Sequence, residues 1–226
     1  MNTKILKQKI LDLAIRGKLV PQDPNDEPAS VLLARIEKEK QKLVKEGKIK
    51  PDKSTTISDD NAYYQNITKN IPNGWANVKF ENVLEYEQPN KYIVNSTKYS
   101  SIYKTPVLTA GKSFILGYTN EENNIFNQFP VIIFDDFTTA SKLVDFPFKV
   151  KSSAMKILHV KKGQNINFVF LVMQTVNCIS DTHKRFWISD FSQKNLLLPP
   201  LNEQNKIVKC VDELFNSLES IRAELS

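Results

Sequence analysis

The chain has 226 residues and a formal net charge of +6. This length suits one well-packed globular domain with accessory helices, because a second full domain would leave both cores thin. The basic balance permits a polyanionic partner such as nucleic acid without requiring one. A structural zinc site needs about four cysteine or histidine ligands, and this chain has only two of each, with no CxxC motif and with Cys178 and Cys210 lying 32 residues apart. No apolar run reaches the roughly 20 residues of a membrane span. We therefore expect a cytoplasmic protein without a metal site.

Residues 1–50 are predicted to form an N-terminal helical segment. An amphipathic helix is expected over residues 3–16 and a second over 28–46, and Gly17 and Gly47 supply their ends. A helix as short as the first is marginal alone, so it needs a partner at the other end of the chain or in a second copy. The apolar residues of the first helix that recur at intervals of four and three are Leu6, Ile10 and Leu13.

A polar linker is expected over residues 51–70, and a mainly β domain over 71–201. Short runs rich in β-branched and aromatic residues, bounded by Gly, Pro and Asn, support the β prediction. The apolar run 166–176 is predicted from its length to be a buried helix packed on that domain. The predicted strands cover residues 91–94, 105–109, 114–118, 129–134, 142–145, 154–160 and 185–189.

A C-terminal coiled-coil helix is expected over residues 202–226. Pro199 and Pro200 end the globular domain, and Asn202 is predicted to cap the helix. With the first helix, this segment is expected to form a coiled-coil-like spacer beside an α+β domain with packed helices. The apolar residues with the heptad spacing of a helix seam are Ile207, Val211, Leu214, Leu218 and Ile221.

A search for catalytic motifs yields no catalytic residue. The six glycines form neither GxGxxG nor GxxxxGK[ST], so no dinucleotide or nucleotide loop is expected. The segment Leu198-Pro199-Pro200-Leu201 resembles the (N/D)PP(Y/F) loop of amino-methyltransferases, but leucines replace the polar and aromatic residues that this loop needs for its chemistry. Asp135 and Asp136 resemble a nuclease metal pair but lack a Glu-x-Lys partner after them.

Three polar clusters are candidates for DNA contact. Hydroxyls and cations in loops can meet phosphates and base edges, although a solvated loop or a Ser/Thr-rich turn is an equally open interpretation. The candidate DNA-binding residues are Lys112, Ser113, Thr138, Thr139, Ser141, Lys142, His183, Lys184 and Arg185.

Several motifs resemble the specificity (S) subunits of type I restriction-modification systems. They comprise the helical motif at residues 6–21, Ile71-Pro72-Asn73-Gly74-Trp75 and Leu198-Pro199-Pro200-Leu201-Asn202-Glu203-Gln204. Segments 106–112, 134–139 and 148–153 are similar to one class of target recognition domain. Together these motifs span almost the whole chain.

The resemblance implies a non-catalytic subunit that reads one half of a split double-stranded DNA target. It also implies docking to a methyltransferase (M) subunit, which would bind S-adenosylmethionine, and indirectly to a restriction (R) subunit. Because one recognition domain is present, we expect a half-size form that homodimerises through its terminal helices, or a truncation of a longer chain. The alternatives are a free-standing dimeric DNA-binding regulator and a nuclease or DNA methyltransferase in its own right.

Overall fold

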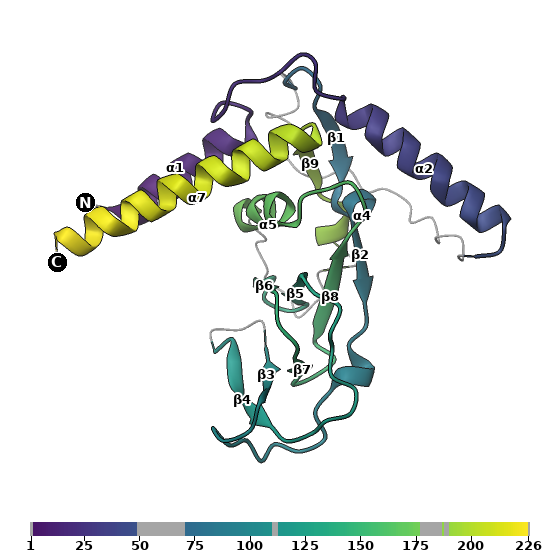
Figure 1. The fold of residues 1–226 in the computed structure, drawn as a ribbon, viewed down its shortest axis with the longest axis vertical. Helices are drawn as coiled ribbons and strands as arrows, with labels where there is room; N and C mark the ends of the chain where they lie inside the picture. The colour runs from purple at the N-terminus through teal and green to yellow at the C-terminus, as the bar shows by residue number, and fades with distance from the viewer. Residues whose placement is uncertain (1, 49–70, 110–112, 177–186, 188–189, 226) are drawn as a thin grey trace. The chain divides into compact units, whose positions relative to one another are not determined.

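The computed structural model describes residues 2–48, 71–109, 113–176, 187 and 190–225 (Figure 1). The predicted linker at 51–70 lies outside these residues. The chain divides into two compact units. The helical unit comprises Met1–Phe80, Lys162–Thr175 and Gln193–Ser226, and the β unit comprises Glu81–Lys161 and Val176–Ser192.

In the helical unit, two helices from opposite ends of the sequence lie side by side (Figure 1). They run in opposite directions, because Lys7 near the start of the first pairs with Glu219 near the end of the last. A third helix contacts both, and a short antiparallel sheet places Val78 opposite Leu196. The elements of this unit are α1 (Thr3–Ile15), α2 (Ala29–Lys45), β1 (Ala76–Lys79), α5 (Ile166–Thr175), β9 (Asn195–Leu198) and α7 (Leu201–Glu224).

The first two helices end where the sequence predicts. Gly17 and Gly47 follow the helices with φ of +65° and +69°, in the left-handed region that favours glycine. After α1, the amides of Gly17 and Lys18 donate to the carbonyls of Ala14 and Leu13, and the same pattern follows α2. These are Schellman motifs, which satisfy carbonyls that the helix itself leaves unpaired.

The start of α7 corrects the predicted cap. Pro200 occupies the N-cap position. Asn202 is the second residue of the helix, and its side chain donates to Asp26 Oδ1 at 2.8 Å. The cap prediction was wrong because the helix begins at Leu201, one residue before Asn202, and the Asn202 side chain binds the loop before α2 instead of an amide of the first turn. The next two side chains also bind other segments: Glu203 accepts from Trp75 Nε1, and Gln204 accepts from the amide of Asn165.

The β unit contains two described sheets. In the four-stranded sheet the order is β2-β8-β5-β6, and every neighbouring pair is antiparallel. In the three-stranded sheet the order is β4-β3-β7, with β3 parallel to β7. The strands are β2 (Leu84–Glu87), β3 (Thr105–Leu108), β4 (Ile115–Thr119), β5 (Val131–Asp135), β6 (Ser141–Val144), β7 (Lys149–Val150) and β8 (Met155–Val160). Short helices α4 (Phe80–Val83), η2 (Asn90–Tyr92) and η3 (Phe191–Gln193) complete the described elements.

One hydrophobic cluster joins the strands of the β unit. It combines aliphatic residues of β5 and β8 with aromatic residues of the connecting loops, and Phe126 stacks near Phe148 with a centroid distance of 4.8 Å. Each fully buried large side chain of this kind contributes about 1.5–3 kcal/mol to folding. The buried members are Tyr92, Leu108, Phe126, Val131, Ile133, Val144, Phe148, Val150, Met155 and Ile157.

Most predicted strands are confirmed, and one assignment was wrong. Segment 91–94 forms the η2 turn and one isolated bridge, because Pro89 and Asn90 favour a turn. The helix predicted over 166–176 is confirmed as α5, which contacts α1 and α7 in the helical unit. Strands β1, β2, β7 and β9 were not predicted, and segment 185–189 lies largely outside the described residues.

Candidate nucleic-acid interface

A tight turn connects β5 to β6, and the turn together with the start of β6 carries four of the predicted DNA-binding residues. The carboxylate of Asp135 accepts the amides of Phe137 and Thr138 at 2.9 and 3.0 Å. The Asp135 backbone closes the turn, because its amide donates to the carbonyl of Ala140 and its carbonyl accepts from Thr139. The path of the chain between the two strands is therefore fixed by these four hydrogen bonds and by a longer one of 3.4 Å, in which Thr138 Oγ1 accepts from the amide of Ala140.

The turn exposes polar side chains. Thr138 and Lys142 are exposed, and Thr139 and Ser141 are half-buried. Thr139 has φ of +58°, a conformation that costs a non-glycine residue about 1–2 kcal/mol. Residues held in such conformations cluster at binding sites, where the surrounding structure compensates for the strain. The Ser/Thr-turn alternative and the binding alternative are thus compatible, because the same turn orders the groups that it exposes.

A buried ion pair anchors the base of this turn. Asp136 Oδ2 lies 3.0 Å from Lys156 Nζ, and both side chains are only 1% exposed. The other carboxylate oxygen accepts the amide of Trp187 at 2.9 Å, and Lys156 also donates to Gln88. Removing either member would leave an uncompensated buried charge, at a cost of about 3–5 kcal/mol.

Asp135 and Asp136, which resemble a nuclease metal pair in sequence, bind separate partners. Asp135 binds backbone amides of its own turn, whereas Asp136 pairs with a lysine and a distant amide. Among the described residues, no group of three His, Cys, Asp or Glu side chains is arranged to hold a metal ion.

The other predicted contact residues divide between described and undescribed segments. Ser113 is exposed directly before β4, in the three-stranded sheet, and is not part of the β5–β6 turn. Lys112, His183, Lys184 and Arg185 lie outside the described residues.

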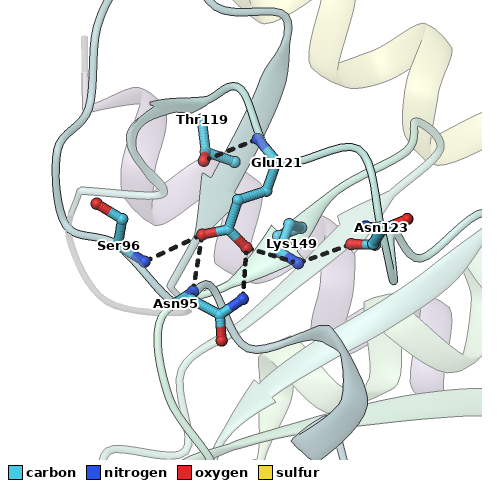
Figure 2. Close-up of polar contacts among 6 residues, drawn as sticks. All are labelled: Asn95, Ser96, Thr119, Glu121, Asn123 and Lys149. Atoms are coloured by element: carbon cyan, nitrogen blue, oxygen red, sulfur yellow. Dashed lines mark hydrogen bonds and ion pairs between the residues drawn. The ribbon is translucent and has the colours of Figure 1, made fainter.

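Sequence reasoning missed a second polar cluster, shown in Figure 2. The carboxylate of Glu121 accepts the amides of Asn95 and Ser96 and lies 3.0 Å from Lys149 Nζ. Lys149 is buried on β7 and also donates to the carbonyl of Asn123. Burial alone would raise the pKa of Glu121, but these donors outweigh it and hold the pKa below its ordinary value. The cluster joins two loops to strand β7, so we assign it a structural role. No local sequence pattern predicts it.

A third cluster surrounds Glu87 on β2. Its carboxylate lies 2.9 Å from Lys91 Nζ and 3.0 Å from His159 Nε2, and it accepts the hydroxyl of Tyr92. Burial opposes ionisation, but the hydrogen bonds from these neighbours lower the pKa of Glu87. This carboxylate therefore connects β2, η2 and β8.

Part of the predicted helix seam is buried within one chain. Ile207 and Val211 are fully buried, and Leu13 and Ile10 are half-buried. Further along α7 the seam is exposed, with Leu214 at 36% and Ile221 at 43%, while Leu218 is half-buried. Leu6 on α1 is exposed as well. No helix among the described residues has the length and hydropathy to span a membrane.

Sequence comparison relates the chain to one family. A family model described as the type I restriction modification DNA specificity domain matches residues 72–226. The chain is 43% identical over 157 residues to the type I restriction enzyme EcoR124I/EcoR124II specificity subunit of Escherichia coli, covering 64% of this chain and 39% of that protein. It is 32% identical over 248 residues to the EcoAI specificity subunit of Escherichia coli, covering 96% and 40%. The chain thus spans about two fifths of the length of these relatives.

Solved structures share the fold. A chain from a study of complex assembly and conformational transition of the type I R-M system gives a TM-score of 0.55 at 13% identity, covering 98% of this chain and 53% of that one. The type I restriction-modification system S subunit from M. genitalium gives a TM-score of 0.51 at 12% identity, covering 99% and 55%. These likenesses confirm the predicted α+β fold class.

Proposed function

Because the chain belongs to the type I restriction modification DNA specificity family, we propose that it is a non-catalytic subunit that reads one half of a split DNA target. The observation that supports this most directly is the β5–β6 turn, which holds exposed Thr138 in a fixed geometry, with exposed Lys142 on the adjoining strand β6. Hydroxyls and ammonium groups are the donors that reach base edges and phosphates. A preordered turn loses little conformational entropy on binding.

The methyltransferase subunit is the proposed enzyme of the complex, and it would bring S-adenosylmethionine and connect the chain indirectly to the restriction subunit. The helical unit is the proposed docking platform for it. The complex would act in the cytoplasm. A specificity subunit should need the assembled complex for full affinity, so equally tight specific binding by the isolated chain would favour the free-standing regulator.

A second copy of the chain is the proposed partner of the distal part of α1 and α7. One copy supplies one β unit, whereas a split target has two halves. The apolar side chains that one chain leaves exposed there lie close to its two termini and are Ile5, Leu6, Leu214, Ile221 and Leu225. Two-fold pairing through this surface would present two β units to a palindromic split target. The 24 residues of α7 span about 36 Å at 1.5 Å per residue, which would set the spacer between half-sites.

The test is DNA selection by the chain assembled with a type I methyltransferase subunit. From a random duplex pool, the wild-type complex should enrich a split motif. Lys142→Ala should weaken binding to all sequences and reduce the slope of log K against log salt by about 0.9, because one phosphate contact is lost. Thr138→Val keeps the shape of the side chain but removes its hydroxyl, so it should relax preference at one base pair by about 1–3 kcal/mol.

Lys209→Ala is the matched control. This lysine is also exposed, with 80% of its side chain accessible, but it lies on α7. Its replacement should leave both the motif and the salt slope unchanged. The DNA-recognition proposal fails if the wild-type complex enriches no motif, and the assignment of the turn fails if Lys142→Ala and Thr138→Val behave like Lys209→Ala.

A further inference from the structure

Phe137 is an exposed aromatic residue at the centre of the β5–β6 turn. Its side chain is 43% exposed, although the phenylalanine three positions earlier, Phe134, is fully buried. Burial of a phenylalanine side chain stabilises a fold by about 1.5–3 kcal/mol, and Phe137 contributes only part of this. Folding of the β unit therefore does not explain why the turn presents a phenyl ring.

The backbone that carries the ring is held on both sides. The amide of Phe137 donates to Asp135 Oδ1, and the following amide of Thr138 donates to the same atom. The preceding residue, Asp136, is tied to Lys156 and to the amide of Trp187. A side chain with two rotatable bonds on an ordered backbone loses little entropy when it contacts a ligand, which is why aromatic residues serve as rigid anchors.

The chemical surroundings of Phe137 indicate what it contacts. Along the turn it is followed by exposed Thr138 and, at the start of β6, by exposed Lys142. A protein-docking surface would need a contiguous apolar patch, whereas here one ring stands among hydroxyls and a cation. The major groove offers a matching pattern, because the C5-methyl group of thymine is an apolar point among hydrogen-bonding groups and phosphates.

We infer that Phe137 packs against the C5-methyl group of a thymine in the target and so specifies a T·A base pair. This inference rests on the proposed function and assigns part of its specificity to a residue that hydrogen bonding does not identify. Thr138 and Lys142 then supply polar contacts to the same target.

Deoxyuridine substitution tests the contact, because uracil keeps the hydrogen-bonding groups of thymine and lacks only the methyl group. The probes are duplexes of the sequence that the wild-type complex selects, with each thymine replaced in turn by deoxyuridine. For the wild type, each half-site should contain one thymine whose replacement weakens binding. A single replacement there should weaken binding about fourfold, the factor that corresponds to one buried methyl group at about 0.8 kcal/mol. The Phe137→Ala complex should bind the duplex with thymine at that position and the duplex with deoxyuridine there with equal affinity.

Phe129→Ala is the matched control, since Phe129 is 41% exposed at the opposite end of β5. This variant should keep the wild-type response to deoxyuridine. The inference is overturned if no deoxyuridine duplex weakens wild-type binding, or if Phe137→Ala keeps the full response. Reduced bending of the DNA by Phe137→Ala without a methyl effect would also overturn it, in favour of a wedge between bases. If the wild-type complex selects no sequence at all, the proposed function itself has failed.

Discussion

Glu203 combines burial with a carboxylate at the start of α7. The side chain is 1% exposed, and its Oε2 accepts from Trp75 Nε1 at 2.9 Å. Its Oε1 finds no hydrogen-bond partner among the described residues. Burial, assisted by the nearby charge of Asp26, raises the pKa of Glu203 above its ordinary value of 4.5. The folded state therefore binds this proton more tightly than the unfolded state does.

The sign of the resulting pH dependence follows from linkage. The stability that this raised pKa provides is fully present below pH 4.5 and is lost as the pH rises through the pKa of the folded state. Glu203→Gln keeps an acceptor for Trp75 and removes the charge. Between pH 4 and pH 8, the free energy of unfolding of this variant should therefore rise relative to that of the wild type.

Urea unfolding at the two pH values measures this difference. Glu213→Gln is the control, because Glu213 lies on the same helix with 66% of its side chain exposed. Its free energy of unfolding should follow that of the wild type at both pH values. An unchanged difference between Glu203→Gln and wild type across this range would contradict the assignment of a raised pKa.

At the scale of elements, the two helix-terminal glycines have the same local role in different surroundings. Gly17 has φ of +65°, and a Cβ atom there would lie 2.8 Å from Pro72 Cγ and 3.1 Å from Trp75 Cζ2. Gly47 has φ of +69°, and a Cβ atom there would meet nothing within 4 Å. Local conformation alone would make the two positions equivalent, so packing decides the difference between them.

Alanine substitution at each glycine should separate the two effects. Gly47→Ala should destabilise by about 1 kcal/mol, the cost of a left-handed residue with a Cβ atom. Gly17→Ala should cost about 1–3 kcal/mol more, because the added methyl group forces Pro72 and Trp75 to move. Thermal or urea unfolding compares the two, and equal costs would show that the α1 terminus tolerates the methyl group.

At the scale of the whole molecule, the exposed seam is where a second copy would bind. Within one chain, Leu214 and Ile221 are 36% and 43% exposed, so a lysine at either position can keep its charged end in solvent. Light scattering at micromolar concentration should give a dimer for the wild type and a monomer for the double variant Leu214→Lys, Ile221→Lys. Burial of two lysines in a symmetric apolar interface is strongly unfavourable.

Ile102→Lys is the control for this experiment, since Ile102 is an exposed apolar residue of the β unit. It should leave the dimer intact. A monomeric wild type, both alone and with the methyltransferase subunit, would refute the dimer proposal and leave the chain with one β unit in the complex.

Much of the fold was predictable from sequence because its signals are local. The four and three spacing, the glycines at 17 and 47, and the β-branched runs act over a few residues, and they yielded α1, α2, α5, α7 and most strands of the β unit. The missed strands have only two to four residues each, too few for a period to show. The run that forms β9 is three leucines, which suit a strand or a helix equally.

For the candidate site, the sequence by itself identified the chemistry of the β5–β6 turn and the helix spacing of the seam. Only the tertiary structure decided which of those residues are available. Asp136 finds Lys156 and Trp187 through strand pairing, so it anchors the turn while Phe137 is exposed. Likewise, packing within the helical unit buries Ile207 and Val211 but leaves Leu214 and Ile221 exposed. Exposure depends on contacts between segments far apart in the chain, and a local pattern contains no information about them.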